Sequence, residues 1–256
     1  MNNKVALITG ATSGIGEATA EVLAGAGFDL VITGRREERL RLLEKRLSGD
    51  GTRVIPLCFD VREREETRRA IASLPSPWRD NIEVLVNNAG LAVGTRPLQE
   101  GIADDWERMI DTNIKGLLHV TREVAPLMIG NGRGHILNIA SIAGKEVYPG
   151  GNVYCATKHA VDALSRGMRV DMVSRGIKVT NIAPGMVETE FSVVRYKGDE
   201  RAAANVYAGL KPLDARDVAE VILFAVTRPA HVCLNDVVIM PTAQASARDV
   251  HRDPGA

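Results

Sequence analysis

The sequence predicts an α/β protein built on a three-layer, doubly wound parallel sheet. Two observations lead to this fold class. Apolar runs typical of strands alternate with helical patterns along the 256 residues, an order found in parallel sheets that are covered by helices on both faces. The first of these runs, residues 5–8, leads through a glycine-rich turn directly into a helical pattern. The length and the alternation indicate a single domain over residues 1–248.

The individual elements follow from the spacing of apolar residues. Residues 5–8 form an unbroken apolar run, which is typical of a strand buried on both faces. Strands are expected at residues 5–8, 28–33, 53–59, 82–86, 135–140, 177–182 and 236–240. Helices are expected at residues 17–24, 37–47, 62–74, 104–129, 152–175 and 214–227. Residues 249–256 are polar, contain Pro254 and are expected to form a loose tail.

Composition argues against several classes of function. The 32 basic and 32 acidic residues balance, so no overall charge favours nucleic acid or an anionic membrane. Cys58, Cys155 and Cys233 are far apart and lack metal or redox spacing, which indicates reduced thiols in a cytoplasmic protein. The histidines show no metal spacing either, so no metal is expected. We also expect no signal peptide and no membrane span.

A glycine-rich turn with the spacing Gly-x-x-x-Gly-x-Gly follows the first strand. It is expected to bind the phosphates of a nucleotide through Gly10, Thr12, Ser13, Gly14, Ile15 and Gly16. Small residues let the backbone N–H groups and the helix N-terminus approach one anion. The alternative is a tight strand-to-helix turn without a ligand. Polar clusters at the ends of later strands favour the nucleotide, because ligands of such sheets lie beyond the carboxyl ends of the strands.

The residues after the second strand indicate which nucleotide is bound. An NAD site usually has an acidic residue there, which bonds the ribose 2′-hydroxyl. This sequence instead has Arg35 and Arg36, and two guanidiniums suit the 2′-phosphate of NADP. The alternative is that both arginines merely begin an exposed charged helix. Asp60 and Val61, after the third strand, are expected beside the adenine, although Asp60 could also cap the helix that follows.

A tyrosine and a lysine four positions apart suggest the chemistry. Tyr154 and Lys158 lie in the first turns of a helical pattern, so their side chains project to one side. A nearby ammonium and the charge of oxidised nicotinamide would lower the phenol pKa, so that Tyr154 could exchange a proton with an alcohol. Ser141 ends the fifth strand and could hydrogen-bond the reacting oxygen. Exposed helices often carry such pairs; the preceding nucleotide motifs and serine favour the catalytic interpretation.

These motifs, in this order, resemble the single-domain short-chain dehydrogenase/reductase family over nearly the whole chain. The resemblance rests on Thr9-Gly10-x-x-x-Gly14-x-Gly16, Asn87-Asn88-Ala89-Gly90, Asn113, Ser141, Tyr154-x-x-x-Lys158 and Pro184-Gly185. It implies a Rossmann-type sheet, a nicotinamide cofactor and a catalytic tetrad of Asn113, Ser141, Tyr154 and Lys158. It further implies cofactor contacts from Asn87, Ala89, Gly90, Tyr154, Lys158, Pro184, Gly185, Val187 and Thr189. In the family, the asparagine holds a water that links the lysine to solvent.

Other segments resemble the NADP-dependent 3-hydroxy acid dehydrogenases, a group that includes serine 3-dehydrogenase and L-allo-threonine dehydrogenase. These segments are residues 150–154, 191–199, 229–232 and 240–242. The resemblance implies oxidation of the 3-hydroxyl of a short hydroxy acid, such as serine, allo-threonine or a 3-hydroxypropionate-like acid. Its carboxylate needs a cation. Arg195 is the first candidate because it lies in the segment 186–212 that could cover the site, and Lys197 is the second. Alternatively, Arg195 is a solvated residue of a mobile cover.

Two other functions remain open from the sequence. One is a short-chain reductase for a bulkier neutral substrate, such as a ketoacyl thioester or a steroid, against which Arg195 argues. The other is a non-catalytic NADP-binding regulator, which would not need Ser141, Tyr154 and Lys158 intact.

The resemblance also implies a homotetramer, an assembly of closed symmetry. Val161, Leu164 and Met168 would form an apolar stripe along one long helix. The stripe could join subunits, or it could simply pack on the sheet.

Overall fold

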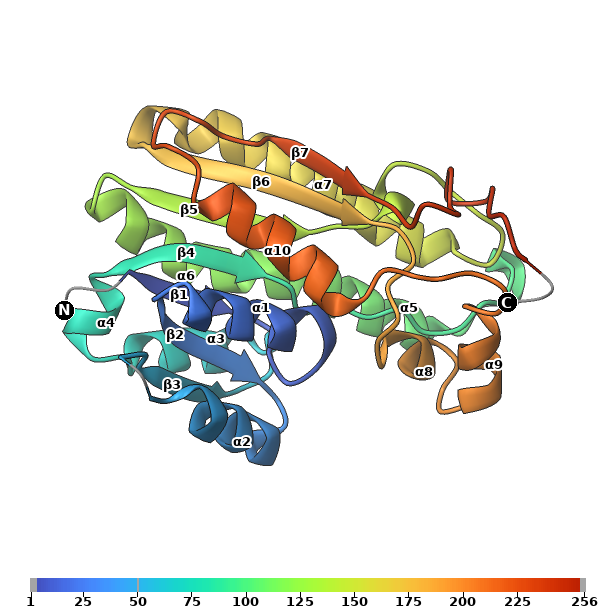
Figure 1. Cartoon of the computed structure of the whole chain (residues 1–256), viewed down its shortest axis with the longest axis horizontal. Helices are drawn as coiled ribbons and strands as arrows, with labels where there is room; N and C mark the ends of the chain where they lie inside the picture. The colour runs from blue at the N-terminus through green and yellow to red at the C-terminus, as the bar shows by residue number, and fades with distance from the viewer. Residues whose placement is uncertain (1–3, 50, 254–256) are drawn as a thin grey trace.

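Parallel strands form one sheet through the centre of the molecule, which confirms the predicted fold class (Figure 1). The computed structural model describes residues 4–49 and 51–253, and within them the sheet has seven strands. The strands are β1 (Val5–Ile8), β2 (Asp29–Gly34), β3 (Val54–Cys58), β4 (Ile82–Asn87), β5 (Gly134–Ile139), β6 (Ile177–Pro184) and β7 (Asp236–Ile239). Their spatial order is β3-β2-β1-β4-β5-β6-β7. The order reverses between β1 and β4, the place where doubly wound sheets open a ligand crevice.

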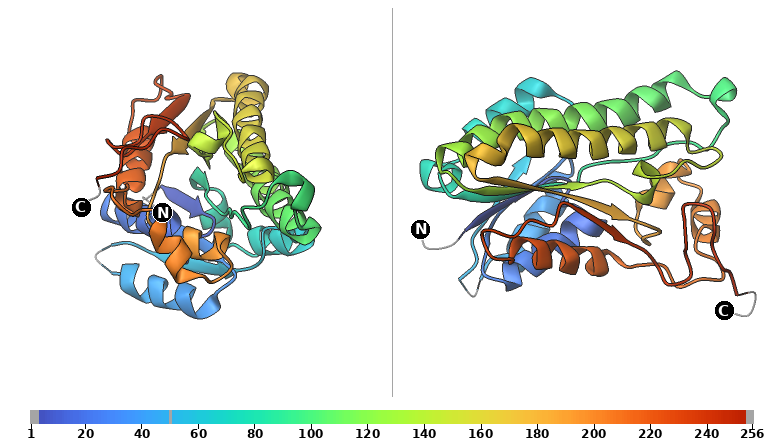
Figure 2. Two further views of the ribbon diagram at one scale, coloured as in Figure 1. Left: turned by 90° about the vertical axis from the view of Figure 1, so that its right-hand side faces the viewer. Right: turned by 90° about the horizontal axis from the view of Figure 1, so that it is seen from above.

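Helices cover both faces of the sheet, so the molecule has three layers (Figure 2). One face is covered by α1 (Gly14–Gly25), α2 (Glu37–Leu47) and α10 (Ala215–Val226). The other is covered by α3 (Arg64–Ala72), α6 (Leu117–Gly130) and α7 (Asn152–Met172). The shorter helices are α4 (Ser76–Arg79), α5 (Ala103–Ile110), α8 (Phe191–Arg195) and α9 (Glu200–Asn205). Over the described part of the chain, no helix combines the length and apolarity needed to cross a membrane.

β1 shows why the central strands are apolar throughout. Successive side chains of a strand point to opposite faces of the sheet. Val5 and Leu7 pack in the core below α3, α6 and α7, while Ala6 and Ile8 pack in the core below α1, α2 and α10. All four side chains are fully buried. Burial of each large side chain contributes roughly 1.5–3 kcal/mol to the free energy of folding, so apolar residues are favoured on both faces of the strand.

The long helix expected over residues 104–129 is interrupted. A π-helical turn, Asp111–Gly116, separates α5 from α6. Asn113 lies in this turn, and its side chain exchanges two hydrogen bonds of 2.8 Å with the backbone N–H and carbonyl of Leu91. Such turns insert one residue into a helix and often occur at functional sites. The apolar spacing resumes in α6, so periodicity alone does not detect the interruption.

The C-terminal segment is less loose than expected. The His251 N–H donates to the Ala243 carbonyl at 2.8 Å, and the Asp253 N–H donates to the Gly209 carbonyl at 2.7 Å. The Arg252 guanidinium also donates to the Val206 carbonyl at 2.9 Å. The expectation of a loose tail is therefore wrong for residues 249–253, because their polar groups bond to backbone carbonyls. Residues 254–256 lie outside the described part.

The stripe on α7 packs on the sheet. Val161 and Met168 are buried in the core, and Leu164 packs against it. The alternative of simple packing is therefore correct for this stripe, and any contact between subunits along α7 must use its other face.

Candidate active site

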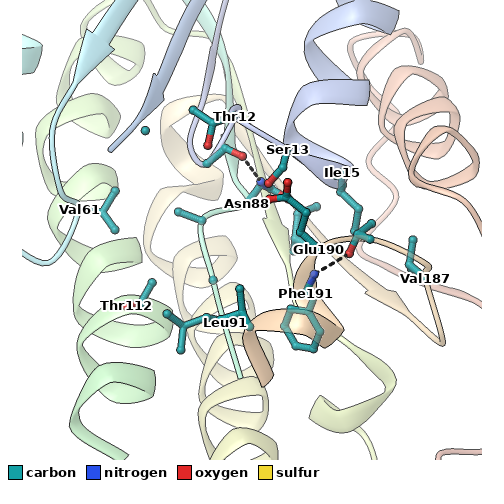
Figure 3. Close-up of a pocket in the computed structure, with 18 of the residues that line it drawn as sticks. Thr12, Ser13, Ile15, Val61, Asn88, Leu91, Thr112, Val187, Glu190 and Phe191 are labelled. Atoms are coloured by element: carbon teal, nitrogen blue, oxygen red, sulfur yellow. Dashed lines mark hydrogen bonds between the residues drawn. The ribbon is translucent and has the colours of Figure 1, made fainter. Parts of the chain in front are cut away.

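A cavity of about 340 Å³ lies at the carboxyl ends of the strands and brings most of the predicted site residues together (Figure 3). The predicted residues that line it are Gly10, Thr12, Ser13, Gly14, Ile15, Arg35, Arg36, Asp60, Val61, Ala89, Gly90, Ser141, Tyr154, Lys158, Pro184, Gly185, Val187 and Thr189. The predicted residues that do not line the cavity are Gly16, Asn87, Asn113 and Arg195. The cavity is also lined by residues that were not among the predicted contacts, including Asn88, Leu91, Thr112, Glu190 and Phe191.

The glycine-rich turn is shaped by close contacts of its backbone. A Cβ at Gly16 would lie 2.3 Å from the Gly10 carbonyl oxygen, so only glycine fits there. Gly10 and Gly14 have φ angles of 66° and 54°, a region that favours glycine. Among the described residues, no side chain caps α1 at Ser13. The first N–H groups of α1 thus lack a side-chain acceptor, and the turn fits the pyrophosphate of a dinucleotide.

The segment after β4 holds this turn in place. Asn88 donates through Nδ2 to the carbonyls of Thr9 at 2.9 Å and Gly10 at 3.2 Å. The Thr9 hydroxyl accepts from the N–H groups of Asn88 and Ala89 at 3.0 Å each. Asn87 instead points into the protein interior, where it donates to Thr121 and Asn138 at 2.9 Å each. The Asn87 side chain therefore belongs to a buried network, and the cofactor contact expected of Asn87 stays a prediction for its backbone.

Arg36 lies over the glycine-rich turn. Its guanidinium donates from Nε to the Thr12 hydroxyl at 3.0 Å and from Nη2 to the Ser13 hydroxyl at 2.7 Å. Its Nη1 pairs with the Glu190 carboxylate at 2.8 Å, and Arg39 pairs with the same carboxylate at 2.6 Å. Partial burial would raise the pKa of Glu190, but the hydrogen bonds and charges of Arg36 and Arg39 lower it to about 2. This cationic cluster adjoins the turn at the expected adenosine end of the cavity.

Asp60 faces the same end but is already partnered. Arg62 donates to it from the backbone N–H at 3.0 Å and from Nη2 at 2.7 Å, and Arg35 lies 3.6 Å away. Burial raises the pKa of Asp60, but these hydrogen bonds and charges outweigh it and keep the pKa below its ordinary value. Asp60 does not cap the following helix, since Glu63 is the N-cap of α3. Its bond to the backbone two residues on forms an Asx turn instead.

Ser141, Tyr154 and Lys158 meet at the other end of the cavity. Ser141 follows β5, and its hydroxyl accepts from the Ala143 N–H at 3.1 Å. Tyr154 and Lys158 project from the first turns of α7 and are 8% and 6% exposed. The Lys158 ammonium donates to the Ile139 carbonyl at 2.8 Å and lies 5.9 Å from the centre of the Tyr154 ring. Near complete burial leaves these groups facing the cavity rather than bulk water.

Asn113 supports this group from behind. Its Nδ2 donates to the Thr157 hydroxyl at 3.0 Å, and that hydroxyl donates to the Tyr154 carbonyl at 2.7 Å. A Cβ at Gly90 would lie 3.2 Å from Asn113 Oδ1 and 3.5 Å from Lys158 Nζ. Asn113 therefore fixes the first turn of α7 and adjoins Lys158 across Gly90, without itself lining the cavity.

Burial dominates the titration of the reactive groups. It raises the pKa of Tyr154 well above its ordinary value, as does the neighbouring Tyr148, against the lowering effects of Ser141 and Arg195. Burial also lowers the pKa of Lys158 to about 8. Without a cofactor, burial outweighs the groups that favour the ionised phenol. The lowering of the phenol pKa by Lys158 and by an oxidised nicotinamide therefore stays a prediction.

Arg195 lies on the far side of Tyr154, in a second cavity of about 210 Å³ that Tyr154 also lines. Its Nη1 donates to the Tyr148 hydroxyl at 3.0 Å, and its guanidinium lies 5.3 Å from the Tyr148 ring centre and 6.0 Å from that of Tyr154. Within the described residues, Arg195 has no carboxylate partner, and its buried Nε has no hydrogen bond. Lys197 is different, because it pairs with Asp105 at 2.7 Å.

The sheet, the glycine-rich turn and the buried Ser-Tyr-Lys group define a nicotinamide-dependent oxidoreductase of the Rossmann type. The chain belongs to the short-chain dehydrogenase family, whose profile matches residues 4–199. This match confirms the family that the sequence motifs predict.

Individual relatives resemble the chain over almost its full length. It is 46% identical over 250 residues to the NADP-dependent 3-hydroxy acid dehydrogenase YdfG of Salmonella typhi, covering 97% of this chain and 99% of the relative. It is 44% identical over 241 residues to the serine 3-dehydrogenase of Rhizobium radiobacter, with coverages of 94% and 95%. The sulfoacetaldehyde reductase 2 of Chromohalobacter salexigens is 47% identical over 251 residues, with coverages of 97% and 99%.

A solved structure agrees with this resemblance. The closed form of serine dehydrogenase complexed with NADP+ superposes with a TM-score of 0.90 at 45% identity, covering 97% of this chain and 99% of that one. The predicted similarity to 3-hydroxy acid dehydrogenases is therefore confirmed.

Proposed function

We propose that this protein is an NADP-dependent dehydrogenase that oxidises the 3-hydroxyl of a short hydroxy acid. One observation carries the proposal: a guanidinium without a carboxylate partner among the described residues, that of Arg195, lies 6.0 Å from the ring of the buried Tyr154. A buried or half-buried cation of this kind is costly unless an anion joins it. The carboxylate of a small substrate, whose hydroxyl meets Tyr154, would supply that anion.

The roles of the reactive residues follow from their positions. Ser141 holds the substrate hydroxyl, and ionised Tyr154 accepts its proton at the phenolate oxygen while the C3–H bond breaks and its hydride would pass to the oxidised cofactor. Bound NADP+ would supply the hydride acceptor and a positive charge that favours the ionised phenol. Lys158, whose pKa is lowered to about 8 by burial, adds a second positive charge, and the family resemblance supports a bond from it to the cofactor ribose. In the reverse direction, Tyr154 returns the proton to the carbonyl oxygen.

Arg195 suits the role of carboxylate clamp better than Lys197. The Lys197 ammonium is already neutralised by Asp105 at 2.7 Å. Arg195 is held only by a neutral phenol, and its planar fork can bind a carboxylate through two parallel hydrogen bonds. The names of the relatives also fit an anionic substrate, since serine and 3-hydroxy acids carry a carboxylate and sulfoacetaldehyde carries a sulfonate. A bulky neutral ketone would leave Arg195 unpaired.

A substrate screen tests the proposal. L-Serine, L-allo-threonine and 3-hydroxypropionate would each be supplied with NADP+, and NADPH formation would be followed by absorbance. 3-Hydroxypropionamide is the matched neutral alcohol, and sulfoacetaldehyde with NADPH tests the sulfonate. We expect turnover of at least one hydroxy acid that exceeds turnover of the amide. Preferential reduction of neutral ketones or ketoacyl thioesters would contradict the proposal, and NADP binding without turnover would indicate the regulator.

We further propose a homotetramer in the cytoplasm. Val170 is 77% exposed on the outer face of α7, in line with the exposed small residues Ala156, Ala163 and Gly167. Small side chains allow two helices to pack closely, so this face suits a symmetric contact. Light scattering at micromolar concentration should give the tetramer mass; a monomer mass would reject this assembly.

The cysteines support the proposed cytoplasmic location. Cys58, Cys155 and Cys233 are free thiols, which fit a reducing compartment.

A further inference from the structure

We propose that Glu190 tunes the choice of cofactor by placing its own carboxylate in the site that the 2′-phosphate of NADP would take. The inference rests on the proposed NADP dependence. It adds Arg39 to the phosphate site and makes the Glu190 carboxylate an internal competitor of the phosphate.

The first step is the geometry of one carboxylate between two guanidiniums. Glu190 Oε2 lies 2.8 Å from Arg36 Nη1, and Glu190 Oε1 lies 2.6 Å from Arg39 Nη1. Arg36 precedes the first residue of α2, and Arg39 follows three positions later on the same side of the helix. The two arginines thus form a clamp for one small anion with at least two oxygens. The Glu190 carboxylate is such an anion.

The second step is the position of this clamp in the cavity. Arg36 also bonds the hydroxyls of Thr12 and Ser13, in the turn expected to face the phosphates. Figure 3 shows the Glu190 side chain extending toward Ser13. Arg36 follows β2 by two residues, where doubly wound folds recognise the ribose 2′ substituent. The anion site and the expected 2′-phosphate site therefore share the same guanidinium.

The third step concerns charge. A phosphate monoester carries about −1.5 to −2 charges at pH 7, and Glu190 carries a full negative charge there because its pKa is lowered to about 2. The two anions repel each other when they share one guanidinium. Because all three side chains are 41–47% exposed, Glu190 can turn to water when the phosphate binds. An NAD molecule has only a hydroxyl at this position and leaves the Glu190 pairs intact.

The consequence is a specific effect on ligands that carry the 2′-phosphate. Part of the binding free energy of that phosphate is offset by the two ion pairs that must open. Removing the Glu190 charge should therefore tighten NADP and leave NAD nearly unchanged. The natural residue thus moderates the preference for NADP.

Calorimetric titration of the full chain with 2′,5′-ADP and 5′-AMP tests this without catalysis. Glu190→Gln should bind 2′,5′-ADP about three- to tenfold more tightly than wild type, the range expected for opening two exposed pairs. Its affinity for 5′-AMP should stay within about twofold of the wild-type value. Arg39→Ala should weaken the binding of 2′,5′-ADP and leave that of 5′-AMP unchanged. Glu38→Gln is the matched control, since it removes a negative charge from an exposed position of α2 next to Arg39 and should change neither affinity by more than about twofold.

Each other outcome overturns the inference. Weaker binding of both ligands by Glu190→Gln would mean that Glu190 closes over the nucleotide as a whole. Weaker binding of 2′,5′-ADP alone would mean that it orients the arginines, and no change would mean that the pairs are incidental. If wild type binds 2′,5′-ADP no better than 5′-AMP, the NADP preference fails, and this inference fails with it.

Discussion

The guanidinium of Arg195 lies 6.0 Å from the centre of the Tyr154 ring, and no carboxylate among the described residues neutralises it. A Tyr148 hydroxyl at 3.0 Å fixes its position. The cation acts on Tyr154 as well, because its charge lowers the pKa of the phenol, which burial otherwise raises. In the ligand-free protein, Arg195 therefore offsets part of the burial effect on Tyr154, and a bound substrate carboxylate would reduce this charge effect by pairing with the guanidinium.

Replacement of the phenol tests the proton transfer. Tyr154→Phe removes only the hydroxyl, so the buried ring still packs against Phe191, whose ring centre is 5.6 Å away. We expect the oxidation rate to fall at least about 10²- to 10⁴-fold, the range for a lost general acid or base. NADP affinity, followed by fluorescence, should change little. Near-normal turnover by this variant would refute the assignment of Tyr154 as the proton acceptor.

The arginines after β2 are expected to select NADP. Changing Arg35 and Arg36 together to Ala removes two cations from the adenosine end of the cavity. The Michaelis constant for NADP should rise far more than that for NAD, because only NADP presents a phosphate to them. Arg41→Ala is a control, since Arg41 pairs with Glu37 on the exposed side of α2 and is 68% exposed. An equal effect of the double change on both cofactors would exclude a role in selection.

Replacement of two glycines of α1 by alanine should have opposite effects on the free energy of unfolding. In Gly16→Ala the new Cβ would lie 2.3 Å from the Gly10 carbonyl, so the glycine-rich turn must move. We expect a loss of about 1–3 kcal/mol in the free energy of unfolding and weaker cofactor binding. In Gly25→Ala the Cβ meets nothing within 4 Å, and the better helix propensity of alanine should add up to about 1 kcal/mol. Denaturant titrations would compare the two, and similar effects would contradict the packing argument.

His135 should make stability depend on pH. Burial lowers its pKa from the usual 6.5 to about 3, helped by the charge of Lys178. Below pH 6.5 this histidine binds a proton in the unfolded chain but stays neutral in the folded protein. The free energy of unfolding should therefore fall as pH drops from 6.5 toward 3, by about 2 kcal/mol between pH 7 and pH 5.

A matched pair of variants isolates this contribution. Between pH 7 and pH 5, the free energy of unfolding of His135→Gln should fall by about 2 kcal/mol less than that of wild type, as measured by denaturant unfolding at both pH values. For His231→Gln, a change at an exposed position, the free energy of unfolding should fall by as much as that of wild type. If His135→Gln loses as much stability as wild type, His135 does not set the acid limit.

The parts of the structure that the sequence predicted share a simple physical signal. Buried strands read as apolar runs, and helices of ten or more residues show periodic apolar faces, so the alternation and the sheet were predictable. α4, α8 and α9 were not predicted, because α4 (Ser76–Arg79), for example, is too short to show periodicity.

The candidate site was predictable where adjacent residues carry it, as in the glycine-rich turn and the Tyr154–Lys158 pair. Glu190 was missed because it is 154 residues from Arg36, and only the fold brings them together. Arg39 had a local signal, since it lies one helical turn after Arg36. The inward orientation of Asn87 depends on its buried partners Thr121 and Asn138, which no local pattern reveals.

The most direct test of the proposed function compares wild type and Arg195→Ala on an acid and its neutral analogue. The two substrates are 3-hydroxypropionate and 3-hydroxypropionamide, and kcat/KM is measured with saturating NADP+. Arg201→Ala, an exposed arginine of α9, serves as the control. If Arg195 binds the carboxylate, kcat/KM for the acid falls by a factor equivalent to at least about 2 kcal/mol, while that for the amide changes by less than about threefold. An equal fall for both substrates, or no fall for either, would contradict the account.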